Sequence, residues 1–228
     1  MAKKRVTRKQ LLKEPDEFIT TTGKLIAWGR ENSRQLIGGG CVFLGLVILI
    51  AAYSYYQEKQ SNAALALYNR AMAGYEAAGG AKQPAAALAA VKPDLERLTT
   101  EFGGQPAGKL GRIMYGHFSL AAHARDEAVA LYTAALEDFG TDPSLANFIH
   151  NGLGAAYSQK GEFQTAIEHY KKVVESASPV LKDTALFHLG RLYDALGQEE
   201  ESRQAYQQLS TDFPKSIFTE MVKDKITG

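Results

Sequence analysis

The chain of 228 residues contains a single cysteine, Cys41. One cysteine cannot form an intrachain disulfide or a thiolate metal cluster, so both are excluded within one chain. The five histidines show no metal-ligand spacing such as H-E-x-x-H, and no G-x-S-x-G nucleophile motif occurs. We therefore expect no catalytic residues, no cofactor site and no metal site, and we predict that the chain is not an enzyme.

Only one segment approaches a nucleotide-binding motif. Residues 103–110, GGQPAGKL, nearly spell a phosphate loop, but Leu110 stands where the Mg²⁺-coordinating Ser or Thr belongs. No strand pattern precedes the segment, so we interpret it as a turn between helices. Residues 57–228 carry 17 basic and 21 acidic side chains, and this balance lacks the basic surface that nucleic-acid binding requires.

One long hydrophobic run decides the organisation of the chain. No charged side chain lies between Arg34 and Glu58, and segment 36–56 reads LIGGGCVFLGLVILIAAYSYY. As a helix this segment spans roughly 31 Å, about the hydrocarbon thickness of a bilayer. We therefore predict a single transmembrane helix over 36–56. Cys41 and Gly45 form a small-xxx-small pair that would permit self-association or docking against another membrane protein, although such pairs are common in single spans.

The charges that flank this run predict its orientation. Residues 1–35 carry nine Lys or Arg side chains and four Asp or Glu side chains. Basic flanks stay in the cytoplasm, so we predict a cytoplasmic arm over 1–35, a signal anchor over 36–56 and an exported domain over 57–228. The alternative is a cleaved signal peptide. It is disfavoured because about 35 residues precede the run and no A-x-A site follows it.

The arm before the run contains a second helical pattern. Glu14-Pro15-Asp16-Glu17 is typical of a helix start, and Phe18, Thr22, Leu25 and Ile26 follow as a narrow apolar stripe. This helix could lie on the inner membrane surface with Lys24, Arg30 and Arg34 near anionic lipid. A solvated juxtamembrane helix without a specific role is the alternative. Residues 1–10 are expected to be disordered or lipid-associated.

The exported part shows an internal repeat. Two windows align without a gap at an offset of 36 residues, and each window ends near a proline, Pro179 and Pro214. The matching positions are Leu153-Gly154, Tyr157, Gly161, Ala166 and Tyr170 in the first window, and Leu189-Gly190, Tyr193, Gly197, Ser202 and Tyr206 in the second.

The chemistry of these positions predicts paired helices. Gly154 and Gly190 let two helices approach closely, and Ala166 accepts the same contact from the partner helix. Gly161 and Gly197 supply the turn at which the chain reverses. Each helix pair leaves one apolar face uncovered, so the pairs are expected to stack.

Further units precede and follow these two. Gly116, Ala128 and Tyr132 stand 38 residues before their counterparts, and we expect an upstream helix pair over 63–78 and 86–102. Pro93 either kinks the second of these helices or starts it. A short helix over 216–226 is expected to cap the last face. The fold class is therefore all-α, a solenoid of about three and a half helix pairs. The buried stripes predicted upstream are Leu65, Tyr68, Met72 and Tyr75 on the first helix and Leu95, Leu98 and Phe102 on the second.

The repeated Leu-Gly, Tyr, Gly and Ala-x-x-x-Tyr positions resemble the tetratricopeptide repeat. The whole layout, with an arm, a signal anchor and a repeat domain, resembles the YfgM-like ancillary Sec translocon subunit family. That resemblance implies a bacterial inner-membrane protein whose periplasmic repeat domain binds translocon, chaperone or exported-protein partners. The alternative is a structural organiser of cell-envelope or cell-division complexes that acts through its membrane helix and arm.

The resemblance also implies where partners bind. In stacked tetratricopeptide units the first helix of each pair lines a concave groove. Phe148 and Phe187 are aromatic anchors in one interpretation and fill gaps between adjacent units in the other. Arg191 is suited to pair with an acidic group or a C-terminal carboxylate. The predicted groove residues are Phe148, Asn151, Phe187, Arg191 and Asp194.

Overall fold

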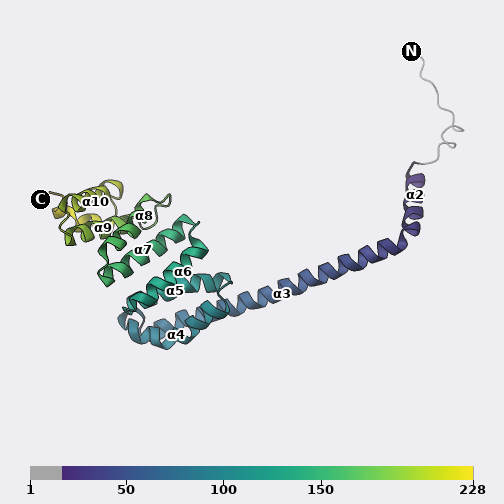
Figure 1. Ribbon diagram of the computed structural model, residues 1–228, viewed down its shortest axis with the longest axis horizontal. Helices are drawn as coiled ribbons and strands as arrows, with labels where there is room; N and C mark the ends of the chain where they lie inside the picture. The colour runs from purple at the N-terminus through teal and green to yellow at the C-terminus, as the bar shows by residue number, and fades with distance from the viewer. Residues whose placement is uncertain (1–16, 228) are drawn as a thin grey trace, which may run out of the picture. The chain divides into compact units, whose positions relative to one another are not determined.

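A computed structural model describes residues 17–227, and every regular element within them is a helix (Figure 1). This confirms the predicted all-α class. The chain divides into two compact units, Met1–Glu58 and Lys59–Gly228. The segment 1–10 and the start of the predicted arm helix at Glu14 to Asp16 lie outside the described residues.

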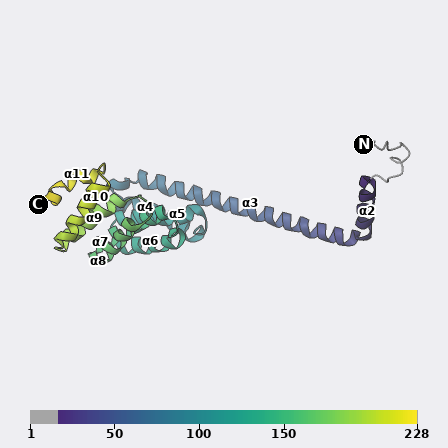
Figure 2. The ribbon, with the colours of Figure 1, turned by 90° about the horizontal axis from the view of Figure 1, so that it is seen from above.

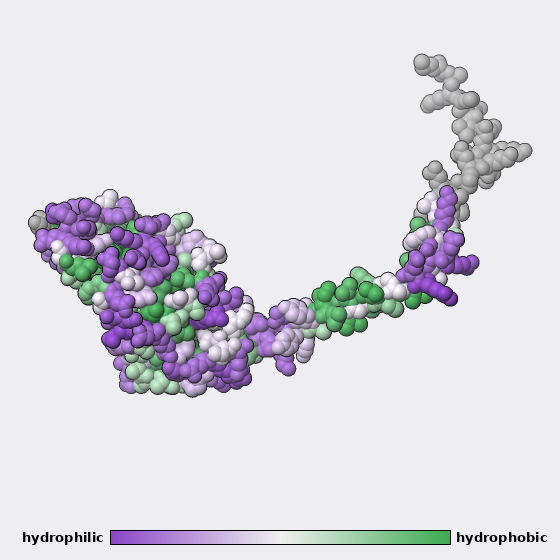
Figure 3. Space-filling view, in the orientation of Figure 1, coloured by the Kyte–Doolittle hydropathy of each residue, from purple (hydrophilic) through white to green (hydrophobic). Residues whose placement is uncertain are grey.

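The first unit contains helix α2 and the apolar part of helix α3. Helix α2 spans Glu17–Glu31, and α3 spans Ser33–Ala77 with Asn32 between them. Within residues 17–227, α3 is the one helix long and apolar enough to cross a membrane, and its most apolar window has a mean hydropathy of 2.4. Figure 3 shows this apolar stretch of α3 as exposed side chains with hydrophilic ones on both sides.

Helix α3 does not end where the apolar run ends. We expected a separate helix over 63–78, but these residues form the last turns of α3. The predicted stripe is also displaced by one residue at its start: Ala64, Leu67 and Ala71 are buried, whereas Leu65 is 51% exposed. Alanine at two of these positions lets α4 approach α3 closely, which larger side chains would prevent.

The second unit continues as a series of antiparallel helices that follow one another in space (Figures 1 and 2). The last part of α3 pairs with α4, three helical hairpins follow, and two short helices close the array. In these described residues we count four helix pairs and a cap, more than the predicted three and a half. The helices are α4 (Pro84–Glu101), α5 (Pro106–Ala121), α6 (Arg125–Phe139), α7 (Pro143–Lys160), α8 (Phe163–Glu175), α9 (Lys182–Ala195), α10 (Glu199–Asp212), α11 (Ile217–Met221) and α12 (Lys223–Thr227), with a 3₁₀ turn at Gly80–Lys82.

The positions of Pro93 and Pro106 decide between the alternatives left open for α4 and for the segment 103–110. Helix α4 begins at Pro84, so Pro93 lies inside the helix and does not start it. Pro106 begins α5, so the segment 103–106 is a turn and not a phosphate loop. The predicted single capping helix over 216–226 is two helices, α11 and α12, separated at Val222.

A glycine–tyrosine contact recurs in each hairpin and confirms the predicted register. A Cβ atom at Gly154 would lie 2.8 Å from Cζ of Tyr170, and one at Gly190 would lie 2.2 Å from Cε1 of Tyr206. The same pairing occurs in the first hairpin between Gly116 and the Tyr132 ring. The three tyrosines are at least 97% buried, so each ring is held directly against the backbone of the facing helix. The helices of a hairpin can be this close only because no side chain stands at the glycine.

The reversal between the two helices of a hairpin uses a left-handed residue. Gly161 and Gly197 have φ angles of 78° and 71°, as the sequence predicted. The first hairpin has His123 at the equivalent position, with a φ angle of 60°. Histidine has a steric cost there that glycine does not.

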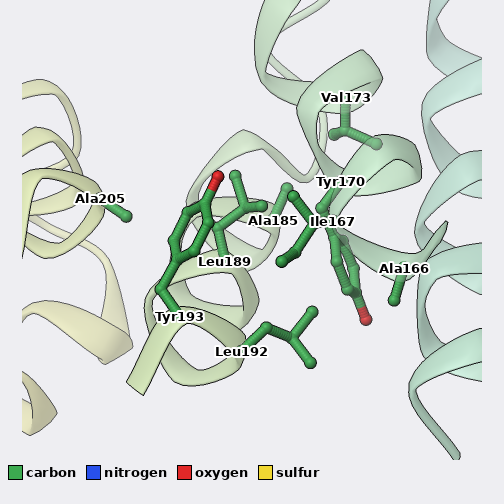
Figure 4. Packing of buried hydrophobic residues seen from close by; sticks show 9 residues of the cluster. All are labelled: Ala166, Ile167, Tyr170, Val173, Ala185, Leu189, Leu192, Tyr193 and Ala205. Carbon is green, nitrogen blue, oxygen red and sulfur yellow. The ribbon is translucent and has the colours of Figure 1, made fainter. Parts of the chain in front are cut away.

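The hydrophobic core is continuous between successive hairpins (Figure 4). Tyr170 and Val173 of α8 pack with Leu189 and Tyr193 of α9 in one cluster of buried residues. Polar contacts add to this packing at the junctions between hairpins. The buried Asn147 side chain of α7 donates to the carbonyl oxygens of Ser178 and Val180 at 3.2 and 2.8 Å, in the loop that leads into α9.

The cap repeats this junction. Asp183 stands 36 residues after Asn147, and it accepts a hydrogen bond of 2.8 Å from the Ser216 hydroxyl, in the loop that leads into α11. Val222 is 2% exposed and packs with Leu186 and Leu209. Helices α11 and α12 therefore cover the apolar face that the last hairpin would otherwise leave open.

Candidate protein-binding groove

Three cavities follow one another along the first helices of the hairpins. The first, of about 470 Å³, lies between α5 and α7, and the second, of about 390 Å³, lies between α7 and α9. The third, of about 510 Å³, lies between α9 and the cap. Ala155 lines the first two, and Arg191 and Ala195 line the last two. The shared residues show that the three cavities are neighbours in a row, and we call this row the α5–α9 groove.

The groove is built from equivalent positions of successive repeats. With the offsets of 38 and 36 residues, His117, Ala155 and Arg191 occupy one position on α5, α7 and α9. Ile113, Asn151 and Phe187 occupy another. Side chains at such positions stack along the solenoid, so the repeat itself generates the row of lining residues. The chemistry changes along the row, from Ile and His on α5 to Phe and Arg on α9.

Two of the predicted groove residues line the first cavity. Phe148 is 53% exposed although its ring is large and apolar. Asn151 lies one turn further along α7, and its buried Oδ1 atom has no hydrogen-bond partner among the described residues. The rest of the lining is almost entirely apolar and includes Ile113, Met114 and Leu120. This cavity can therefore accept an apolar side chain and offers one polar atom near it.

The other predicted residues belong to the third cavity, and two of them are engaged by the cap. The Phe187 ring stacks on the Phe218 ring with their centroids 4.5 Å apart. Asp194 accepts hydrogen bonds from Ser202 and Tyr206 and forms an ion pair of 3.0 Å with Lys225. Of the two interpretations of Phe187, this arrangement matches gap filling against the last unit.

Arg191 connects the second and third cavities. Its guanidinium lies 5.8 Å from the centroid of the Phe187 ring, and the side chain is exposed. No Asp or Glu is among the residues that line the first two cavities, so Arg191 is their one formal charge. The neighbouring His188 is half-buried, and this burial, followed by the charge of Arg191, lowers the pKa of its imidazole. The wall of these two cavities is thus neutral except for one available cation.

Sequence reasoning missed the α5 side of the groove. One wall of the first cavity is formed by Ile113, Met114, His117 and Leu120. The 38-residue offset would have placed His117 at the position equivalent to Ala155. Leu181 also lines this cavity, from a loop position with a φ angle of 61°. Nothing in the residue type of Leu181 signals that left-handed conformation.

A pair of histidines joins α7 to α8 beside the groove. The Nδ1 atoms of His150 and His169 are 3.1 Å apart, and the His169 ring stacks on Tyr157 with centroids 5.4 Å apart. Burial lowers the pKa of both imidazoles to about 4, and the positive charge of Lys172 acts in the same direction. At neutral pH one ring therefore donates the hydrogen bond and the other accepts it. Residues 17–227 contain no group of three or more His, Cys, Asp or Glu side chains arranged to hold a metal ion.

The comparisons with known proteins identify a repeat family. A family model described as a Tetratricopeptide repeat-like domain matches residues 27–228, which include the apolar part of α3 as well as the helical hairpins. No curated protein matches the chain.

Proposed function

The chain belongs to the tetratricopeptide repeat-like domain family, and from that premise we propose that it is a membrane-anchored scaffold for protein–protein interaction. Helix α3 anchors it in the bacterial inner membrane, and the α5–α9 groove is presented in the periplasm. Partners of this kind include the translocon, periplasmic chaperones and exported polypeptides. Interaction through a repeat surface is the general use of this family's architecture.

The observation that carries the proposal is the exposed Phe148 ring at the rim of a 470 Å³ apolar cavity. A partner that covers this 53% exposed aromatic side chain removes apolar surface from water, which favours binding. The adjacent Asn151 side chain keeps one acceptor without a partner beside this cavity, and the exposed Arg191 offers an ion pair further along. The groove therefore suits an extended segment that places an apolar side chain between α5 and α7 and an acidic group toward α9.

The membrane part of the proposal is supported by the exposed apolar surface of α3. Large side chains from Leu36 to Ile50 are between 46% and 68% exposed, and burying such a surface in water-free hydrocarbon is strongly favourable. The excess of basic residues before Leu36 favours a cytoplasmic N-terminus.

Site-specific photocrosslinking in intact membranes tests the groove. A photoreactive phenylalanine analogue replaces Phe148 in one version of the full chain and the exposed Glu168 of α8 in a matched control. We expect the groove position to crosslink to a protein partner and the control to give a much lower yield.

A second pair of variants shows whether the groove gives the specificity. Phe148→Ser with Arg191→Gln removes the apolar anchor and the cation from exposed positions and should leave the fold intact by circular dichroism. Loss of the crosslinked partner in chemical crosslinking supports the groove. If the partner is retained by the double variant and lost when α3 is replaced by an unrelated membrane helix, the groove is not the site. The alternative function, an organiser that acts through its membrane helix and arm, would then be favoured. That alternative draws on the open surface around Gly38, Gly39, Gly40 and Gly45, where added Cβ atoms would meet nothing within 4 Å.

A further inference from the structure

Helix α2 presents an apolar face that nothing in the described chain covers. Leu25, Ile26 and Trp28 are 67%, 64% and 56% exposed. At 3.6 residues per turn these three side chains share one half of the helix circumference. Lys24 falls just outside this half on one side and Arg30 just outside it on the other. This order of groups, apolar side chains bordered on both edges by cations, is typical of a helix lying in a membrane interface.

The helical conformation is interrupted between α2 and the apolar part of α3. Helix α2 ends at Glu31 and α3 begins at Ser33. Asn32 stands at the break, and both its backbone N–H and its side-chain Nδ2 donate to the Trp28 carbonyl oxygen at 2.9 Å. The backbone bond is the usual helical one, and the side-chain bond gives the Trp28 carbonyl oxygen a second donor at the helix end. Because the helix is interrupted there, α2 need not continue along the direction of α3.

The apolar surfaces on the two sides of Asn32 are close in the sequence. Leu36, the first residue of the apolar run, follows Trp28 by eight residues and is 47% exposed. A helix joined this closely to a membrane span stays near the membrane surface, which raises the effective concentration of lipid around it. Trp28 stands just before the apolar run, and tryptophan is a residue type that is enriched at the level of the lipid headgroups.

We propose that α2 binds the cytoplasmic surface of the membrane, with Leu25, Ile26 and Trp28 in the headgroup region of anionic phospholipids. The proposal rests on the proposed function to the extent that α3 spans the membrane. Charge complementarity selects anionic lipid as the partner, because residues 1–35 carry nine basic and four acidic side chains. Lys24 and Arg30 at the edges of the apolar face extend to the phosphate groups while that face enters the bilayer.

The chain carries its own probe for this interaction, since Trp28 is its single tryptophan. The full chain is reconstituted into phosphatidylethanolamine vesicles with or without phosphatidylglycerol, and Trp28 emission and its quenching by acrylamide are measured. We expect blue-shifted, weakly quenched emission in vesicles that contain phosphatidylglycerol, and red-shifted, strongly quenched emission in vesicles that lack it. Leu25→Ser with Ile26→Ser should remove the shift in the anionic vesicles. The matched control, Ala27→Ser on the opposite side of α2, should retain it.

Alkaline extraction of the same vesicles separates the two proposals. A chain that resists extraction but shows fully accessible Trp28 in anionic vesicles overturns the lipid-binding proposal and leaves the span intact. A chain that is extracted shows that α3 does not span, and the proposal for α2 falls with it. Shielding of Trp28 that ignores lipid charge and grows with the protein-to-lipid ratio shows that a second copy covers α2, which also overturns the proposal.

Discussion

The close contact between Gly190 and Tyr206 makes a quantitative prediction about the repeat. A Cβ atom at Gly190 would lie 2.2, 2.5 and 2.6 Å from Cε1, Cζ and Cδ1 of Tyr206. Carbon atoms in favourable contact are about 3.5–4.0 Å apart, so Gly190→Ala forces the ring or the helix to move by about 1 Å. The ring cannot move freely, because Tyr206 is 2% exposed and packs in one cluster with Leu186 and Val222.

Two opposing effects set the size of the change. Overpacking of a filled core costs about 1–3 kcal/mol. Alanine gains about 0.8–1.0 kcal/mol over glycine inside a helix. At Gly116 an added Cβ would lie 3.1 Å from the Tyr132 ring, so the ring has to shift by only a few tenths of an ångström and the two effects roughly cancel. We therefore expect Gly190→Ala to destabilise clearly, Gly154→Ala to destabilise less, and Gly116→Ala to change stability little.

Thermal unfolding of the full chain in detergent, followed by circular dichroism, checks this order. A loss of 1 kcal/mol lowers the melting temperature of a domain of this size by roughly 2–4 °C. The double variant Gly190→Ala with Tyr206→Leu should be more stable than the sum of the two single changes predicts, because removing the ring makes room for the methyl group. Equal melting temperatures for Gly190→Ala and Gly116→Ala, or additive effects in the double variant, would refute the contact as the reason for the repeated glycine.

Three further predictions concern the second unit. His123→Gly should raise the unfolding free energy by about 0.5–1 kcal/mol, because the φ angle of 60° is strained for histidine and the change removes only an exposed hydrogen bond of 3.2 Å to Gln159. Urea denaturation measures this free energy, and no gain or a loss would contradict the prediction. Asn147→Ala should lower the melting temperature by an amount equivalent to about 1–3 kcal/mol, because it leaves two loop carbonyls without their donor, and Glu168→Gln on the surface is the neutral control. Lowering the pH from 6.5 to about 4 should reduce stability, because the imidazoles of His150 and His169 take up protons in the unfolded chain while their folded-state pKa values are near 4. Above pH 6.5 the contribution of the two imidazoles to stability is constant. Between pH 4 and 6.5, His169→Phe should make the melting temperature less dependent on pH. An unchanged dependence would exclude the histidine pair as the cause of the loss of stability.

The hairpins could be predicted from the sequence because their contacts join residues that are close in the sequence and of distinctive types. Gly154 and Tyr170, or Gly161 at the turn, belong to a single hairpin, and few structures besides a helical hairpin require glycine and tyrosine at that spacing. The continuity of α3 was less evident, because the pattern changes from apolar to amphipathic at Tyr56. The absence of proline between Pro15 and Pro84 was the signal that no break need occur there.

The groove was predictable only in part, because its walls join residues far apart in sequence. Phe148 and Asn151 could be placed from the repeat alone. The stacking of Phe187 on Phe218 depends on the cap, whose sequence shows no repeat motif. Leu181 enters the first cavity through a left-handed backbone conformation that tertiary packing imposes on a leucine.

Single-cysteine labelling in spheroplasts is the most direct test of the membrane-anchored scaffold, since Cys41 is the one native cysteine to remove. In a Cys41→Ser background, Gln207→Cys places a thiol on the exposed surface of α10, and Thr7→Cys places one in the arm. A membrane-impermeant maleimide should label the α10 position in intact spheroplasts and the arm position only after permeabilisation. Labelling of the arm position alone in intact spheroplasts would contradict the orientation. Protection of both positions until permeabilisation would contradict the span.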